Sequence, residues 1–140
     1  MKVVIDTNVL VAAILSDSGA NREVIRCSLR RRIVPQMGTT LFLEHEDVFE
    51  RGPVLHRCKL TLAEREIFLD AYLSICQWNE LYFTWRPNLK DEGDNHIVEL
   101  AVASGSRYIV TNNIRDFKAS ELHFRGLEII QPSQLLEVLR

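Results

Sequence analysis

The sequence contains little that would bind a metal through sulfur or cross a membrane. Its 140 residues include three cysteines, which lie far apart and form no CxxC pair, so we expect neither a zinc site nor a disulfide framework. No apolar run approaches the roughly 20 residues that cross a bilayer. Because Asp6 and Asn8 interrupt the apolar start of the chain, we expect no signal peptide, no membrane partner and a cytoplasmic protein.

The chain also lacks a net positive charge, because 17 basic residues face 19 acidic ones. The net charge of −2 argues against a protein that holds nucleic acid by bulk charge, so such a role would need a local basic patch and a cation at the site. The best local patch is formed by three arginines that recur every four residues: Arg22, Arg26 and Arg30. A solvated helix face and a contact with an RNA backbone both remain open for this patch.

Glycine-rich phosphate loops are absent, and no Ser-His-Asp or Cys-His set has a convincing arrangement. The remaining composition is that of an ordinary globular protein, with 46% hydrophobic and 26% charged residues. The length fits a single domain, residues 1–140, with enough chain to bury a core.

Strand-like and helix-like segments alternate along the chain. The run Val3–Ile5 is typical of a strand buried on both faces, and Thr61 with Glu64 forms a capping box that starts a helix. We expect further helices at about 8–15, 21–31, 39–51, 94–104 and from 132, strands at 33–37, 107–111 and 127–130, and a short strand or aromatic loop at 81–85. This order predicts an α/β fold, a three-layer α/β/α sandwich around a mainly parallel sheet.

The helix after Thr61 carries an apolar stripe at helical spacing, which we expect to pack in the core. The stripe consists of Ala63, Ile67, Phe68, Ala71, Tyr72, Ile75 and Cys76. Three aromatic residues beyond it, Trp78, Tyr82 and Trp85, could stack on bases, but core or dimer packing is the preferred interpretation.

Acidic and amide side chains are predicted to gather at one edge of the sheet. Asp6 directly follows the first strand, and the carboxyl ends of strands face the crevice where open α/β sheets bind ligands. Glu44 lies at the margin of an apolar helix face, where a carboxylate is costly unless it is compensated. Asp94 begins an almost wholly apolar helix and so points back toward the strand ends. Asn113 and Asp116 follow a later strand that resembles the first.

Each of these residues also has a plain structural interpretation. Asp6 and Asp94 can cap helices, Glu44 can be solvated, and Asp116 can belong to a turn. Converging carboxylates without a cation, however, would repel one another and raise their pKa values. Oxygen ligands suit Mg²⁺ or Mn²⁺, which can polarise a phosphodiester and lower the pKa of a bound water.

The ordered set of segments resembles a PIN-domain nuclease along nearly the whole chain. The segments are Val4–Val9, Leu41–Glu44, Asp94 with Ile97–Ala101, Ile109–Asn113 and Asp116–Phe117. No single segment is specific to this family, but the order of the segments along the chain is. The chain is similar in particular to the toxin components, related to VapC, of bacterial and archaeal toxin–antitoxin pairs, whose aspartate-rich segment resembles Asp91–Asp94.

The resemblance implies a metal-dependent endoribonuclease in which Asp6, Glu44 and Asp94 ligate Mg²⁺ or Mn²⁺. It also implies an RNA substrate, an antitoxin partner and a homodimer. The fourth acidic position departs from the family pattern: many relatives have Asp where this chain has Asn113, whereas others pair Asn with an acid three residues on, as Asp116 is here. The supporting residues implied are Asn8, Asp91, Thr111 and Asn113.

Two other functions stay open. A degenerate PIN domain that serves as an RNA- or protein-binding regulatory module fits Asn113 and the low net charge. A phosphoacceptor domain modified at Asp6 lacks the acid pair that such sites need before the acceptor. His45 and His96 lie beside the acids but are not expected as ligands or bases, because the acids already supply a hard-oxygen site.

Overall fold

The computed structural model describes residues 1–16, 19–51, 57–80, 95–118 and 124–140. Its strands are β1 (Lys2–Ile5), β2 (Val34–Met37), β3 (Gln77–Trp78), β4 (Tyr108–Val110) and β5 (Glu128–Ile130). Its helices are α1 (Thr7–Leu15), α2 (Ala20–Leu29), α3 (Thr39–Arg51), α4 (Leu62–Ile75), α5 (Asn95–Ser104), α6 (Ile114–Lys118) and α7 (Pro132–Val138).

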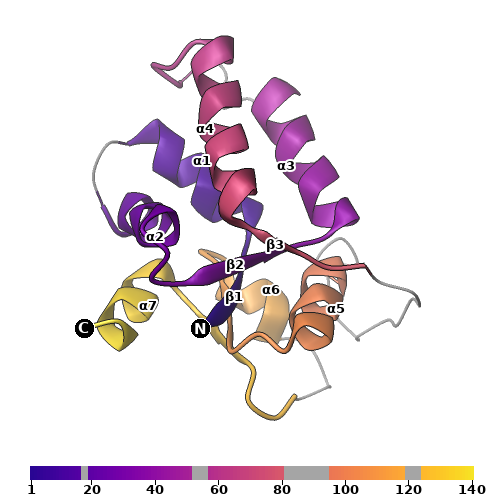
Figure 1. Ribbon diagram of the computed structural model, residues 1–140. Coiled ribbons are helices and arrows are strands. Elements are labelled where there is room, and N and C mark those ends of the chain that lie inside the picture. Colours follow the sequence, from indigo (N-terminus) through magenta and orange to yellow (C-terminus); the bar gives the residue numbers. More distant parts are fainter. Residues whose placement is uncertain (17–18, 52–56, 81–94, 119–123) are drawn as a thin grey trace.

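The strands form one five-stranded sheet in the order β3-β2-β1-β4-β5, and every neighbouring pair is parallel. Helices lie on both sides of this sheet. In Figure 1, α1, α3 and α4 lie above the strands and α5 lies below them. Helix α5 packs against β1, β2 and β4, whereas α2 packs against α1 and α7. The predicted three-layer α/β/α fold is therefore confirmed, with an all-parallel sheet.

The strand order reverses beside β1. The chain builds outward from β1 to β2 and β3, then crosses back to place β4 on the other side of β1. Ile5 pairs with Val110, so the carboxyl ends of β1 and β4 are level. Ligands of open α/β sheets bind at such a switch point, just beyond the strand ends. Asp6 and Thr111 are the first residues beyond these two ends.

Helix α4 begins where the sequence predicts. The Glu64 amide donates to Thr61 Oγ1 at 3.1 Å, and the Thr61 amide donates to Glu64 Oε1 at 3.0 Å. Both bonds of the capping box are thus present, and two amides that the helix cannot satisfy internally gain partners.

The buried face of α4 differs from the predicted stripe. Its fully buried residues are Arg65, Leu69 and Tyr72, while Phe68, Ile75 and Cys76 are partly buried. Ala63, Ile67 and Ala71 are exposed, Ile67 by 68%, so the prediction that they pack in the core was wrong. Apolar residues of α4 lie on most sides of the helix, so its contacts with α2, α3 and β2 decide which side is buried. Arg65 is buried on this face together with the Nε and Nη1 atoms of its guanidinium group.

Two short elements were not predicted. Strand β3 has only two residues, and α6 has five, starting at Ile114. The expected strand or loop at 81–85 lies outside the described residues, as does the expected helix start at Asp94. No helix in the described ranges has both the length and the apolar character needed to cross a membrane.

Candidate active site

Asp6 is fixed at the switch point by both its backbone and its side chain. Its amide donates to the Val110 carbonyl of β4 at 3.0 Å. Its Oδ2 atom accepts from the Thr111 hydroxyl at 2.8 Å and from Asn8 Nδ2 at 3.1 Å, and the residue is only 7% exposed. Asp6 occupies the N-cap position of α1 without making a side-chain capping bond, so the capping role does not explain it.

The electrostatics of Asp6 indicate a second carboxylate nearby. Burial raises the pKa of Asp6 above its ordinary value, the hydrogen bond from Thr111 lowers it, and the negative charge of Glu44 raises it further. The net shift is upward, so ionised Asp6 is destabilised in this setting. A cation bound between the two carboxylates would remove this repulsion.

Glu44 reaches this edge from the first half of α3. Its Oε2 atom lies 3.1 Å from His96 Nε2 of α5. Burial acts to raise the pKa of Glu44, but the contact with His96, together with smaller interactions with His45 and Thr7, outweighs burial, so the pKa is lowered. Apart from this contact, Glu44 Oε2 is buried and receives no well-oriented hydrogen bond from the described residues. A cation bound at this oxygen would share it with His96.

His45 faces the interior and joins α3 to α1 beside Asp6. Its Nδ1 atom lies 2.9 Å from Thr7 Oγ1, and its ring meets Tyr72 edge to face at 6.3 Å. Its Nε2 atom is buried and has no hydrogen-bond partner within the described part of the chain. Burial lowers the pKa of His45 to about 4, so the ring is neutral at pH 7. His45 thus positions Thr7, directly after Asp6, as an uncharged partner.

A network of amide side chains holds the loop after β4. The Asn112 amide donates to Asn8 Oδ1 at 3.2 Å, and Asn112 Nδ2 donates to Asn21 Oδ1 at 2.8 Å. The Asn113 amide donates to Thr111 Oγ1 at 3.0 Å. The sequence did not lead us to predict a role for Asn112 or Asn21. The Thr-Asn pair that follows both β1 and β4 was a signal for Asn112. The network ties the start of α2 to the switch point.

Asp116 lies farther along this loop, on α6. It lines a hollow of about 340 Å³ together with Asn112, Asn113, Ile114, Arg115 and Gln131. Among the residues that the structure describes, no three His, Cys, Asp or Glu side chains are grouped closely enough to hold a metal ion. Asp116 therefore does not form such a group with Asp6 and Glu44. The predicted ligand Asp94 and its neighbour Asp91 lie outside the described residues, so their roles stay predictions.

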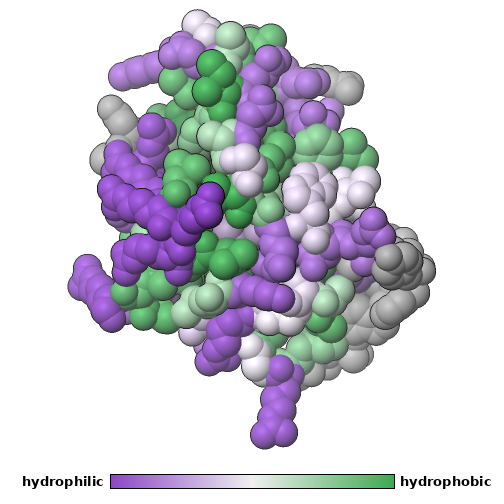
Figure 2. Space-filling view, viewed as in Figure 1, coloured by the Kyte–Doolittle hydropathy of each residue, from purple (hydrophilic) through white to green (hydrophobic). Residues whose placement is uncertain are grey.

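The arginine patch on α2 is partly neutralised. Arg26 and Arg30 both pair with Glu23, at 3.3 and 3.6 Å, and Arg22 donates to the Ala13 carbonyl at 2.7 Å. Figure 2 shows the hydrophilic side chains that gather over α2. The start of α2 is tied to the switch point by Asn21, and Arg30 lies roughly 12 Å along the helix axis from Arg22, at the other end of α2. The contact with RNA stays a prediction.

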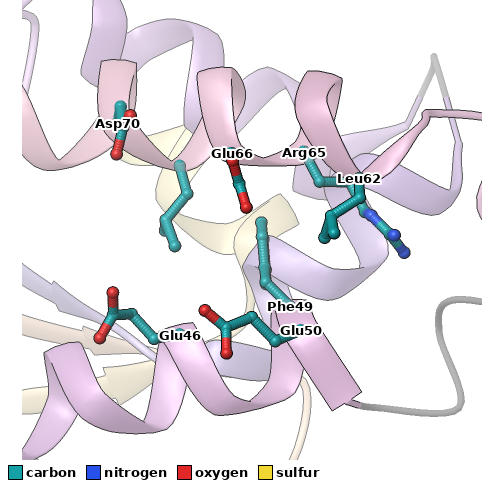
Figure 3. A pocket seen from close by; sticks show the side chains of 8 residues that line it. Glu46, Phe49, Glu50, Leu62, Arg65, Glu66 and Asp70 are labelled. Carbon is teal, nitrogen blue, oxygen red and sulfur yellow. The ribbon is translucent and has the colours of Figure 1, made fainter.

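A second pocket, of about 170 Å³, lies between α3 and α4 (Figure 3). Its lining residues are Glu46, Phe49, Glu50, Leu62, Arg65, Glu66, Leu69 and Asp70. Arg65 is only 7% exposed, and its Nε and Nη1 atoms have no hydrogen-bond partner among the described residues. None of the residues that hold Asp6 lines this pocket, so it is separate from the carboxylate pair.

The comparisons with known proteins agree with this architecture. The sequence profile of the family described as "PIN domain" matches residues 2–115. Among curated proteins, none matches the sequence. The crystal structure of VapBC2 from Rickettsia felis, bound to a DNA fragment from their promoter, is similar with a TM-score of 0.60 and 16% sequence identity. The similarity covers 94% of this chain and 98% of that chain, and at this identity it concerns the fold.

Proposed function

The chain belongs to the PIN domain family, and from this premise we propose that it is a metal-dependent endoribonuclease that hydrolyses RNA phosphodiester bonds. The observation that carries the proposal is the pair of carboxylates at the switch point. Asp6 and Glu44 come from different elements, and the charge of Glu44 raises the pKa of the buried Asp6. Asp6 is buried and Glu44 is partly buried, and a buried acid seldom lies beside a second acid unless a cation or a proton compensates the repulsion.

The donor set fits Mg²⁺ or Mn²⁺. Both donors are carboxylate oxygens, and Glu44 Oε2 lacks a well-oriented hydrogen bond from the described residues. Asp6, Glu44 and Asp94 would hold the ion, with Asp116 assisting from α6. When bound, the ion would polarise the phosphodiester and lower the pKa of the attacking water.

The surrounding residues of this chain orient the acids. Thr111 and Asn8 both donate to Asp6 Oδ2, so the carboxylate keeps one orientation. Partners of this kind position metal ligands, and losing one commonly costs 10- to 100-fold in affinity or activity. His96 of α5 contacts Glu44 Oε2 at 3.1 Å and so positions this carboxylate, which comes from α3.

We further propose that the chain is the toxin of a toxin–antitoxin pair. The fold similarity to VapBC2 supports an antitoxin partner. The exposed residues of α4, among them Ile67 at 68%, support a homodimer through helix faces. The alternative of a catalytically weak binding module is favoured by one observation: Asp116 does not join Asp6 and Glu44 in a three-ligand group among the described residues.

RNA cleavage tests the nuclease proposal. Purified wild type, Asp6→Asn and the control Asp70→Asn, which alters an exposed acid of the α3–α4 pocket, are incubated with total RNA and Mg²⁺, with and without a chelator. We expect chelator-sensitive cleavage by wild type and control, and a loss of at least about 100-fold in Asp6→Asn. Equal cleavage by Asp6→Asn and wild type would contradict the proposal. Stoichiometric Mn²⁺ and RNA binding without cleavage would favour the binding module.

A further inference from the structure

Trp78 is a large aromatic residue that the fold leaves at the surface. It is the last residue of the edge strand β3, and 50% of it is exposed. Trp78 is therefore not a core residue, and of the preferred interpretation, core or dimer packing, only packing in a dimer stays a prediction. An indole ring exposed to this extent at a strand end is available to a ligand.

The sheet register places Trp78 at the same edge as the candidate active site. Trp78 pairs with Met37 of β2, and the register of β2 with β1 continues this row to Ile5, the residue before Asp6. Neighbouring strands lie about 4.8 Å apart, so the backbone of Trp78 is roughly 10 Å from that of Ile5. All strands are parallel, so Trp78 and Asp6 both lie at carboxyl ends.

The indole ring of Trp78 has support from its neighbours. The Phe42 ring meets it edge to face, with 5.4 Å between centroids, and Phe42 lies two residues before Glu44 on α3. The next residue, Asn79, donates from its amide to the Met37 carbonyl at 2.9 Å and from Nδ2 to Gln36 Oε1 at 3.1 Å. These contacts fix the strand end and leave an aromatic surface beside the acidic edge.

We propose that Trp78 is a stacking platform for a nucleobase of single-stranded RNA, about one or two nucleotides from the scissile phosphate. The proposal rests on the proposed nuclease function. Aromatic side chains bind bases by stacking with little regard to sequence, because every base has a π-face. Trp78 is thus a positioning residue that selects unpaired over paired RNA.

The charge distribution favours a base over other occupants. The chain has a net charge of −2, and two arginines of the patch on α2, Arg26 and Arg30, share Glu23, so bulk positive charge contributes little to the affinity for RNA. Stacking does not require positive charge. A protein partner that adds a strand is disfavoured because β3 offers only two residues for pairing.

Binding of a short single-stranded RNA oligonucleotide, followed by fluorescence anisotropy without divalent cations, tests the proposal independently of cleavage. We compare wild type, Trp78→Ala, the conservative Trp78→Phe and the control Val138→Ala, whose side chain is exposed on α7. We expect Trp78→Ala to raise Kd roughly 5- to 150-fold, and Trp78→Phe to retain most of the affinity. Val138→Ala should bind as wild type does.

A base-deletion series separates stacking from a structural effect. Each nucleotide of the oligonucleotide is replaced in turn by an abasic one. Wild type should lose affinity at one position by a factor similar to that of Trp78→Ala, and Trp78→Ala should no longer respond there. In Trp85→Phe, which leaves Trp78 as the remaining tryptophan, RNA should quench the fluorescence.

Unchanged RNA affinity in a folded Trp78→Ala would overturn the stacking proposal. So would a loss of dimer with no change in RNA binding, because that result assigns the ring to a protein interface. If Trp78→Ala does not fold, absence of quenching in Trp85→Phe overturns the proposal instead. If the protein binds RNA through Trp78 but cleaves none, the nuclease function is refuted. The stacking site is then still supported.

Discussion

Acidification is expected to destabilise the protein through His45, because this ring is buried in its neutral form. His45 is 0% exposed, and its Nδ1 atom lies 2.9 Å from Thr7 Oγ1. Burial lowers the pKa of His45 from 6.5 to about 4, although the charge of Glu44 acts in the opposite direction. Charging the ring would therefore place a cation inside the junction of α1 and α3.

The magnitude follows from the two pKa values. Between pH 6.5 and pH 4 the unfolded chain binds a proton that the folded chain does not, so the free energy of unfolding falls as pH decreases. The contribution of neutral His45 is fully present above pH 6.5. One pKa unit corresponds to about 1.4 kcal/mol, so the full loss is about 3 kcal/mol, of which about 2 kcal/mol appears between pH 7 and pH 5.

Urea unfolding at a series of pH values, without divalent cations, measures this effect in wild type and His45→Gln. The raised pKa of Asp6 gives a slope of opposite sign, because folding then favours its protonated form. Asp6 and Glu44 are present in both proteins, so the difference between the two pH profiles reports His45 together with its effect on the pKa of Glu44. Parallel profiles in wild type and His45→Gln would refute the conclusion that His45 is buried and neutral.

Three further substitutions test single features of the fold. Arg31 has a φ of 62° at the end of α2, where its amide donates to the Ser28 carbonyl in a motif that favours glycine. Arg31→Gly should stabilise the protein by roughly 0.5–1 kcal/mol in urea unfolding, since relief of strain exceeds the added entropy of the unfolded chain. Thr61→Ala should cost about 1 kcal/mol by the same assay, because the Glu64 amide loses its partner. Asp6→Asn should raise Tm by a few degrees without divalent cations, because burial raises the pKa of Asp6 and its charged form is unfavourable; a lower Tm would mean that its hydrogen bonds matter more.

The sequence predicts the switch-point acid well because its causes are local. The buried run before Asp6 determines a strand, and a charge is tolerated only where that strand ends. The same reasoning finds β4 and the polar residues after it. Glu44 is predicted by its place at the margin of an apolar helix face, which local spacing reveals.

What the sequence does not predict depends on tertiary contacts. Helical spacing finds apolar positions on α4 but cannot choose between Ile67 and Leu69, because the neighbouring elements decide which face is covered. A two-residue strand such as β3 carries no periodic pattern. The bond between Asn112 and Asn21 joins residues 91 positions apart, so no local signal marks it.

Mn²⁺ titration calorimetry tests the central claim most directly, because it measures the metal site without an RNA substrate. The proteins to compare are wild type, Asp6→Asn, Asp94→Asn and the control Asp70→Asn. We predict stoichiometric Mn²⁺ binding by wild type and Asp70→Asn, and its loss in Asp6→Asn and Asp94→Asn, because only the latter two remove a proposed ligand. Absence of stoichiometric binding by wild type, or equal binding by all four proteins, would contradict a metal site at the switch point.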